Sequence, residues 1–318
     1  MSEWILYPLH NCRGTEQPFQ YHQRQRVDRV NSERFMDIKK VIVYGAGVMG
    51  PQIAQVAAMS GYEVNIVAYR DPYMGRSIKS IAKSLNKFVE KQKMTQDEVD
   101  EILGRITTTT DNIYDGDIVI EAIIENKDIK KDLFVELDQN CAPDVILASN
   151  TSSIPITDLA AATNRPGKVV GMHFMNPVVL MKGVELIRGE KTSDETFKTV
   201  YDLSEKMGKT PGVSNDFAGF IANRILMPYI NEGVWALSQG VSDPKNIDLI
   251  AKTCLNMPMG PLELADLIGI DVCCLIMGVM HERFGDEKYR PCGTLLEMKE
   301  QGNLGRKSGK GFYDYSSK

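Results

Sequence analysis

The sequence has no hydrophobic run long enough to cross a bilayer, and its 318 residues include only four histidines and two tryptophans. A membrane-spanning helix is therefore not expected. The formal net charge of −5 and the pI near 5.6 argue against a general role in binding nucleic acid or a membrane surface. The rest of the composition, 43% hydrophobic and 25% charged, is ordinary for a folded protein with room for two domains.

Cysteine is also scarce, and its six positions form neither C-x-x-C pairs nor the spacing of a secreted disulfide framework. This pattern predicts reduced thiols and a cytoplasmic protein. Cys273 and Cys274 are adjacent within an apolar run, and we interpret them as small buried side chains of a helix rather than as a redox pair. No group of His, Asp and Glu has metal-ligand spacing, so no metal is expected.

Residues 1–36 lack convincing periodicity, and we place the start of the folded body near Met36. Five arginines in this stretch are compatible with a transit peptide or a nucleic-acid arm. However, there is no hydrophobic signal core, and Asp28 and Glu33 dilute the positive charge. We expect a loosely ordered extension with no part in chemistry.

A glycine-rich turn directly follows the short β-branched strand at 41–44. Helical spacing of apolar residues then runs from Ile53 to Met59, and a second strand follows at 64–67. Pro51 fits the first turn of that helix. Strand, G-x-G-x-x-G turn, helix and strand form a unit typical of dinucleotide binding, in which the glycines permit a tight turn, approach of the pyrophosphate and close helix packing. We expect the cofactor to contact Gly45, Gly47, Val48, Met49 and Gly50.

The pattern of elements divides the chain into two domains. Strand-like runs alternate with helical segments as far as about residue 213, which predicts a mostly parallel, doubly wound sheet over 37–216. From 217 to 318 the spacing is helical, notably over 221–237, 246–254 and 262–280, and predicts an all-helical domain. A capping box at Thr95 and Glu98 opens one further helix within the first domain.

Two histidines lie in the predicted folded body. His173 ends a strand-like run and precedes a turn, a position at which open α/β sheets collect catalytic groups, whereas His281 is interpreted as a surface helix residue. Glu185 lies on the next strand-like run. If the two strands are neighbours, Glu185 can bond one imidazole nitrogen and leave the other for a substrate. The alternative, a satisfied core histidine and a surface carboxylate, fits the spacing almost equally well.

Other polar side chains follow the strands of the same domain. Residues 149–153 supply hydroxyl and amide groups, which ordinary turn and N-cap chemistry before a helix at 156–162 also explains in part. Asn223 begins the long helix of the second domain and can either face the interdomain cleft or simply cap that helix.

Six motifs in a fixed order resemble the 3-hydroxyacyl-CoA dehydrogenases, especially the short-chain bacterial 3-hydroxybutyryl-CoA dehydrogenases. The similarity extends from about residue 37 to 316 and implies a Rossmann-type sheet domain followed by an all-helical C-terminal domain. The motifs are GAGVMG at 45–50, EAIIE at 121–125, SNTSS at 149–153, HFMNP at 173–177, GFIANR at 219–224 and PMGP at 258–261.

The resemblance implies hydride transfer between NAD(H) or NADP(H) and the pair acetoacetyl-CoA and (S)-3-hydroxybutyryl-CoA, in a homodimer joined through the C-terminal domain. By this resemblance His173 is the catalytic acid and base, and Glu185 orients it. The residues implied to arrange the thioester are Ser152, Asn176 and Asn223. Those implied to approach the cofactor are Glu125, Lys130, Ser152, Asn176 and Lys307. Ser84 and Lys91 are candidates for holding CoA.

Two positions depart from the family pattern. Where the family usually has an acid for the adenosine ribose, this chain has Ala68, followed by Tyr69 and Arg70. Loss of the carboxylate removes a clash with a 2′-phosphate, and Arg70 can pair with one, so these residues are compatible with NADPH. The habit of the family favours NAD, and Asp71 can substitute for the missing acid through a loop shift, so the sequence leaves the choice of cofactor open. Ala218 replaces a common proline and is expected to change loop stiffness more than chemistry.

Two other functions remain open from the sequence. One is a dehydrogenase of the same superfamily that acts on a free hydroxyacid or sugar acid, which CoA dependence would distinguish. The other is a catalytically silent nucleotide-binding protein, against which the presence of His173 and Glu185 argues.

Overall fold

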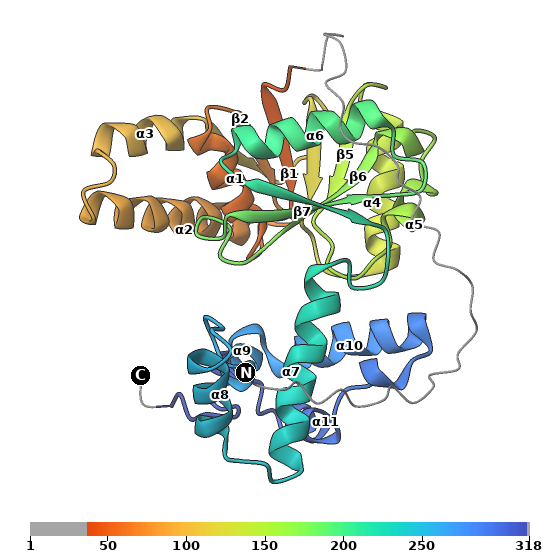
Figure 1. Ribbon diagram of the computed structural model, residues 1–318. Helices are drawn as coiled ribbons and strands as arrows, with labels where there is room; N and C mark the ends of the chain where they lie inside the picture. The colour runs from red at the N-terminus through yellow and green to blue at the C-terminus, as the bar shows by residue number, and fades with distance from the viewer. Residues whose placement is uncertain (1–36, 317–318) are drawn as a thin grey trace, which may run out of the picture. The chain divides into compact units, whose positions relative to one another are not determined.

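The computed structural model describes residues 37–316, so the predicted extension at 1–36 lies outside the described residues. A single eight-stranded sheet with helices on both faces is followed by a region built of helices (Figure 1). The predicted α/β sheet with a helical C-terminal part is therefore confirmed. The division at residue 216 stays a prediction.

The sheet is parallel except at one pair of strands. Its order is β3-β2-β1-β4-β5-β6-β7-β8, and only β6 and β7 are antiparallel. The central strands are buried on both faces, which explains their continuous apolar sequences. The strands are β1 (Lys40–Tyr44), β2 (Glu63–Val67), β3 (Ile106–Thr109), β4 (Ile118–Glu121), β5 (Ile146–Ser149), β6 (Val169–Phe174), β7 (Gly183–Arg188) and β8 (Thr210–Asn215).

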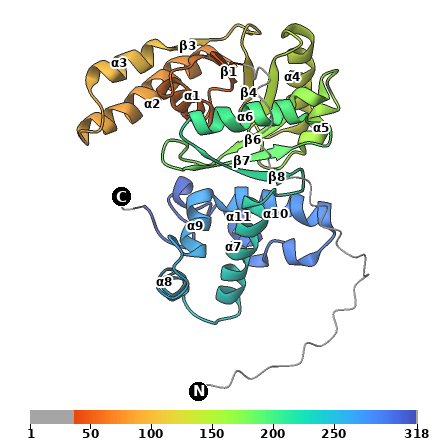
Figure 2. The same cartoon turned by 45° about the horizontal axis from the view of Figure 1, so that its top comes forward.

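Alternate residues of β1 enter two different cores. Val41 and Val43 pack with apolar side chains of α1 (Gly50–Met59), α2 (Asp71–Glu90), α3 (Gln96–Gly104) and α6 (Asp194–Lys206). Ile42 and Tyr44 pack with α4 (Lys127–Asn140) and α5 (Ile156–Ala160) on the other face. In both ribbon views α6 lies along β6 and β7 (Figures 1 and 2). The period of two along the strand thus produces the layers.

Helix boundaries follow the sequence signals closely in the first domain. The predicted capping box is present, with the Thr95 side chain and the Glu98 side chain each bonding the other's backbone N–H. Pro51 lies in the first turn of α1, as predicted. The helix expected at 156–162 is shorter, because α5 ends at Ala160.

The C-terminal helices surround a third core of their own. They are α7 (Ala222–Ser238), α8 (Pro244–Thr253), α9 (Pro261–Ile268), α10 (Ile270–Phe284) and α11 (Gly293–Glu300). The single helical segment predicted at 262–280 is wrong: Gly269, at φ +106°, ends α9 and begins α10. Cys273 and Cys274 are buried on α10, as predicted, and burial raises the pKa of the Cys273 thiol to about 12. None of the helices formed by residues 37–316 is long and apolar enough to span a membrane.

Candidate active site

The glycine turn connects β1 to α1 at the carboxyl end of the strand. Gly45 has a φ of +119°, and a Cβ there would overlap the carbonyl oxygen of Ala122. A Cβ at Gly50 would overlap the carbonyl oxygen of Gly45. At Gly47, by contrast, a Cβ would meet nothing within 4 Å. Two glycines are therefore required by the packing of the turn itself. The third, Gly47, leaves free space at the N-terminus of α1, and a phosphate can approach the backbone there.

His173 and Glu185 are direct partners across the antiparallel pair β6 and β7. The Nδ1 atom of His173 lies 3.0 Å from Oε2 of Glu185, and both side chains are less than a tenth exposed. The edge of the Phe220 ring also packs against the imidazole, with the ring centroids 5.8 Å apart. Of the two interpretations left open by the sequence, the structure supports a paired histidine and carboxylate.

The other carboxylate oxygen of Glu185 binds the start of α7. Its Oε1 accepts hydrogen bonds from the backbone N–H groups of Ile221 and Ala222. These two N–H donors lie at the start of the helix, where its dipole is complementary to a carboxylate. An ionised Glu185 can only accept, so Nδ1 of His173 carries the hydrogen and Nε2 is left to act on a substrate.

Two residues hold the loop after His173: Asn150 of the SNTSS motif, and Gln52, which is not among the predicted site residues. Asn150 Oδ1 accepts a hydrogen bond of 2.8 Å from the backbone N–H of Phe174. On α1, Gln52 donates from Nε2 to Asn176 Oδ1 at 3.0 Å and accepts from the N–H of Val178 at 2.9 Å. The peptide between Asn176 and Pro177 is cis. Gln52 is one of two glutamines on the mostly apolar helix α1, and the sequence carried no further signal for it.

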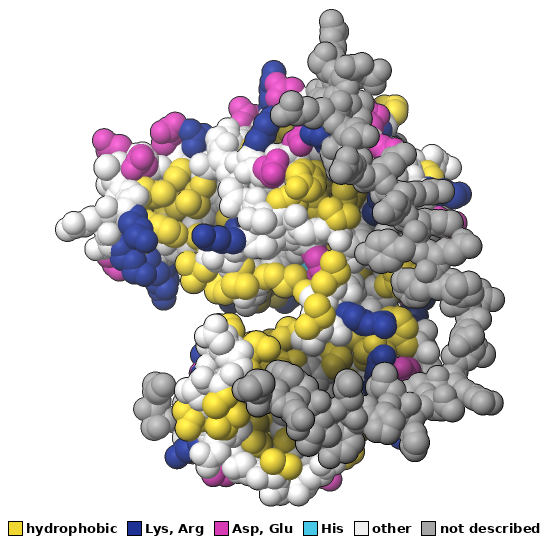
Figure 3. All heavy atoms as spheres, in the orientation of Figure 1, with side chains coloured by type: hydrophobic (Ala, Val, Ile, Leu, Met, Phe, Trp, Pro, Cys, Tyr) yellow, Lys and Arg dark blue, Asp and Glu magenta, His cyan; other side chains and the backbone are white. Residues whose placement is uncertain are grey.

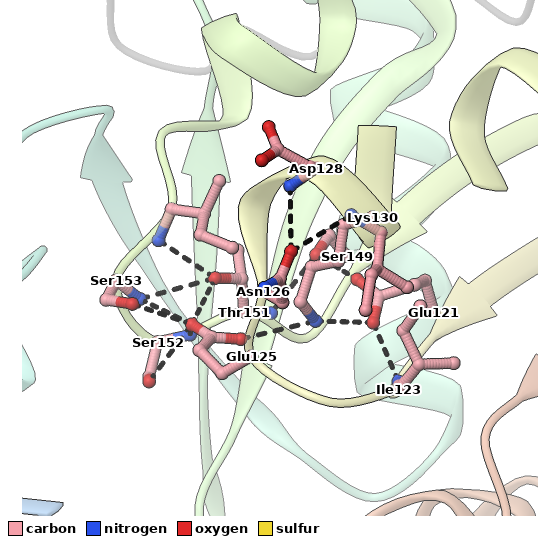
Figure 4. Close-up of polar contacts among 12 residues, drawn as sticks. Glu121, Ile123, Glu125, Asn126, Asp128, Lys130, Ser149, Thr151, Ser152 and Ser153 are labelled. Carbon is pink, nitrogen blue, oxygen red and sulfur yellow. Dashed lines mark hydrogen bonds and ion pairs between the residues drawn. The ribbon is translucent and has the colours of Figure 1, made fainter. Parts of the chain in front are cut away.

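The two acids of the EAIIE motif, Glu121 and Glu125, form ion pairs with Lys130 (Figure 4). The Lys130 side chain is 1% exposed, and its Nζ pairs with Glu121, which is fully buried, and with Oε2 of Glu125 at 3.2 Å. Burial raises the pKa of Glu121, although Lys130 and the donors of Ser149 and Ile123 oppose that rise. The charges are tolerated inside the protein because each has a partner.

Glu125 in turn organises the loop that follows β5 (Figure 4). Its Oε1 accepts hydrogen bonds from the backbone N–H groups of Ser152, at 2.9 Å, and Ser153, at 3.0 Å, and from the Thr151 hydroxyl. Partial desolvation raises the pKa of Glu125, but Lys130 and these donors outweigh it and hold the pKa below its ordinary value. The carboxylate therefore fixes the backbone at Ser152.

Asn223 contacts this same loop. Its side chain is buried, and Nδ2 donates to the carbonyl oxygen of Ser152 at 3.2 Å. The N-cap position of α7 belongs to Ile221, whose side chain makes no cap. Asn223 is thus a link between α7 and the Ser152 loop rather than a helix cap.

The remaining predicted residues lie in three separate settings. The Lys130 ammonium group is buried and pairs with Glu121 and Glu125, and its contact with the cofactor stays a prediction. Lys307 lies in a short 3-10 turn, Arg306–Ser308, and pairs with Asp271 of α10. Ser84 is part of α2, and Lys91 follows its last residue. Over the described part of the chain, no group of three or more His, Cys, Asp and Glu is arranged to hold a metal ion.

Comparison with known proteins gives two adjoining family matches. The model described as "3-hydroxyacyl-CoA dehydrogenase, NAD binding domain" matches residues 40–217, and "3-hydroxyacyl-CoA dehydrogenase, C-terminal domain" matches 219–315. Together these span the sheet, the glycine turn, the His173 and Glu185 pair and the C-terminal helices.

Individual relatives are similar over nearly their whole length. A "Probable 3-hydroxybutyryl-CoA dehydrogenase" of Deinococcus radiodurans is 54% identical, over 86% of this chain and 99% of that protein. The "3-hydroxybutyryl-CoA dehydrogenase" of Bradyrhizobium diazoefficiens is 47% identical, over 87% and 96%. The crystal structure of (S)-3-hydroxybutyryl-CoA dehydrogenase PaaH1 from Ralstonia eutropha superimposes with a TM-score of 0.85 at 43% identity, covering 88% of this chain and 99% of that one. The chain therefore belongs to the 3-hydroxyacyl-CoA dehydrogenase family, whose members are NAD-dependent oxidoreductases.

Proposed function

We propose that the chain is an (S)-3-hydroxybutyryl-CoA dehydrogenase, which interconverts acetoacetyl-CoA and (S)-3-hydroxybutyryl-CoA. The observation that carries the proposal is the pairing of His173 with Glu185 at 3.0 Å, near the carboxyl end of β6. The named activities of the similar bacterial proteins support the choice of a short acyl-CoA substrate.

The nicotinamide cofactor, when bound, supplies or accepts the hydride at C3 of the substrate. In reduction the protonated imidazole of His173 gives its Nε2 proton to the alkoxide oxygen that forms at C3. In oxidation the neutral Nε2 takes the hydroxyl proton. Glu185 accepts the hydrogen bond from Nδ1–H in both states of the ring and stabilises the positive charge while the imidazole is protonated.

The cofactor is proposed to lie over the open face of Gly47, with Val48 and Met49 at the same turn. Ser152, Asn176 and Asn223 are proposed to arrange the thioester, because the first is fixed by Glu125, the second by Gln52, and the third contacts the first. Lys130 is proposed to support this arrangement indirectly, by pairing with Glu125. Lys307, whose ammonium group pairs with Asp271, is proposed to approach the cofactor as well.

The phosphates of CoA are proposed to lie along α2, with Ser84 and Lys91 as contacts. Lysine and arginine side chains gather over this helix (Figure 3). Lys79, Lys83 and Lys87 line a shallow groove there, and Lys87 lies between Ser84 and Lys91 in the sequence. Such a cationic helix suits a ligand with several phosphates.

A homodimer joined through the C-terminal helices is also proposed. Large apolar side chains are exposed along these helices, among them Ile225, Trp235, Leu249, Leu267 and Leu275. Self-association would cover them. A monomeric mass by light scattering at micromolar concentration would contradict the dimer.

The scattered cysteines support a cytoplasmic location, which fractionation of the source cells tests.

Steady-state kinetics with acetoacetyl-CoA and free acetoacetate test the function itself. The proposal expects a much larger kcat/KM for the CoA thioester. A comparable kcat/KM for free acetoacetate would instead identify a hydroxyacid dehydrogenase, and no turnover of either compound would identify a silent nucleotide-binding protein.

A further inference from the structure

The end of β2 lies beside the glycine turn. In dinucleotide-binding sheets this strand end recognises the 2′ position of the cofactor's adenosine ribose. The backbone N–H of Gly45 donates to the carbonyl oxygen of Val67, the last residue of β2, at 2.9 Å. In dinucleotide-binding sheets, an acid near this strand end bonds the ribose 2′-hydroxyl, whereas a nearby arginine accommodates a 2′-phosphate. The residues that follow β2 therefore decide which form of the cofactor fits.

This chain has no carboxylate at the end of the strand. Ala68 continues the ladder, its N–H donating to the carbonyl oxygen of Thr109 at 2.8 Å, and its side chain is a buried methyl group. Tyr69 follows and is 93% exposed, and Arg70 is exposed as well. A 2′-phosphate would thus meet a guanidinium and no negative charge from these three residues.

A second arginine joins the first around one aromatic ring. The guanidinium carbon of Arg70 lies 5.4 Å from the centroid of Tyr73, and that of Arg76 lies 5.8 Å from it. Arg70 also hydrogen-bonds the Tyr73 hydroxyl, which lowers the pKa of that hydroxyl. An aromatic ring orients guanidinium groups without cancelling their charge. Both arginines therefore remain able to bind a phosphate, and Arg70 can do so through two parallel hydrogen bonds.

Asp71, four residues beyond the end of β2, is the first acid that follows the strand. It is the first residue of α2, in the first helical turn, where the helix dipole favours a negative charge. It follows Arg70 in the chain and lies three positions beyond Ala68. Asp71 is the alternative partner for the ribose hydroxyls, and a variant at this position separates the two possibilities.

We propose that the adenosine end of the cofactor site accepts a 2′-phosphate through Arg70, with Arg76 as a second cation, so that the enzyme prefers NADP(H) to NAD(H). The inference rests on the dinucleotide-binding part of the proposed function but not on its substrate. It names the cofactor that delivers the hydride to the same site.

Calorimetric titration of the full chain with NADP⁺ and NAD⁺, without substrate, tests the proposal. We expect a dissociation constant at least tenfold lower for NADP⁺. Arg70→Ala should weaken NADP⁺ binding at least tenfold and change NAD⁺ binding less than twofold, and Ala68→Asp should reverse the preference. Lys245→Ala, which removes one exposed positive charge from α8, should change neither constant.

Tighter binding of NAD⁺ than of NADP⁺ by the wild-type protein would overturn the proposal and leave the proposed function intact. Two further results would also overturn the proposal. One is an equal loss of affinity for NADP⁺ and NAD⁺ in Arg70→Ala. The other is a loss of NAD⁺ affinity in Asp71→Asn that exceeds the loss of NADP⁺ affinity in Arg70→Ala. Binding of neither dinucleotide would overturn the proposed function as well. Parallel kcat/KM values for NADPH and NADH with acetoacetyl-CoA provide a second readout, in which a ratio below one contradicts the proposal.

Discussion

Gln52 donates a hydrogen bond of 3.0 Å to Asn176, although the two residues are 124 positions apart in the sequence. The same side chain accepts from the N–H of Val178 and donates to the carbonyl oxygen of Val48 in the glycine turn. One amide thus joins the proposed pyrophosphate turn to the loop after His173. Cofactor binding and placement of the substrate are expected to depend on each other through it.

Replacing Gln52 by Ala should therefore lower kcat for acetoacetyl-CoA reduction about tenfold, because Asn176 and the Val178 N–H lose their partner. The loss of folding stability should be about 1 kcal/mol. Kinetics and urea unfolding measure the two effects. Gln55→Ala, one turn further along α1, is the control for loss of a helix side chain: kinetics as impaired as in Gln52→Ala would contradict the account.

Gly47→Ala should weaken cofactor binding without affecting the fold, whereas Gly45→Ala should destabilise the fold itself. The space around Gly47 is open and the chain should fold normally, with stability within about 0.5 kcal/mol of wild type. The dissociation constant of Gly47→Ala for the dinucleotide should nevertheless rise at least about tenfold, because the added methyl group would occupy the proposed phosphate site. Gly45→Ala should destabilise the fold, because the residue has positive φ and its Cβ meets Ala122. Unchanged cofactor affinity in Gly47→Ala would refute the location of the site.

Protonation of Glu125 should loosen the Ser152 loop at acid pH. Its pKa in the folded protein is lowered, so the unfolded chain binds this proton more readily than the folded one. The stability that Glu125 contributes is present above its ordinary pKa, and it is lost from about pH 5 downward as the pH falls through the lowered pKa.

The test compares unfolding free energies of wild type and Glu125→Gln at neutral and acid pH. The difference between the two proteins should shrink as the pH falls. Glu121, whose pKa is raised and whose effect has the opposite sign, is present in both proteins and largely cancels in the comparison. A difference that stays constant between neutral pH and about pH 4 would argue against Glu125 as an anchor of the loop.

Glu185→Gln should separate positioning from general acid chemistry. A neutral amide supplies one carbonyl oxygen where the carboxylate bonded both His173 and the start of α7. We expect kcat for reduction to fall about a hundredfold. KM for acetoacetyl-CoA and the dissociation constant for the dinucleotide should stay within about twofold of wild type, because Glu185 contacts His173 and the start of α7. A kcat within a few-fold of wild type, or a loss of dinucleotide binding as large as the loss of kcat, would contradict this positioning role.

The sequence predicted those parts of the fold that depend on local pattern. Continuous apolar runs revealed the buried strands, the glycines revealed the turn, and Thr95 and Glu98 revealed a helix start, because each signal is complete within a few residues. Gly269 was missed as a helix break because the apolar spacing continues across it, and only its positive φ in the folded chain separates α9 from α10.

Contacts between distant segments could not be predicted in the same way. The spacing of His173 and Glu185 permitted a pair, but the antiparallel register that aligns them appears only in the sheet. Lys130 has the sequence pattern of an exposed helix residue, and its burial follows from two carboxylates brought to it by the fold. Long-range pairing of polar groups is set by topology rather than by local composition.

His173 is proposed to transfer the proton at C3, and the decisive test of this role is kcat of the His173→Ala variant for acetoacetyl-CoA reduction. Dinucleotide binding should persist, and circular dichroism should match wild type. His281→Ala removes the histidine of α10, which pairs with Glu287, and should leave kcat unchanged. We expect kcat of His173→Ala to fall by about a hundredfold to ten-thousandfold. A folded variant with kcat within a few-fold of wild type would contradict it.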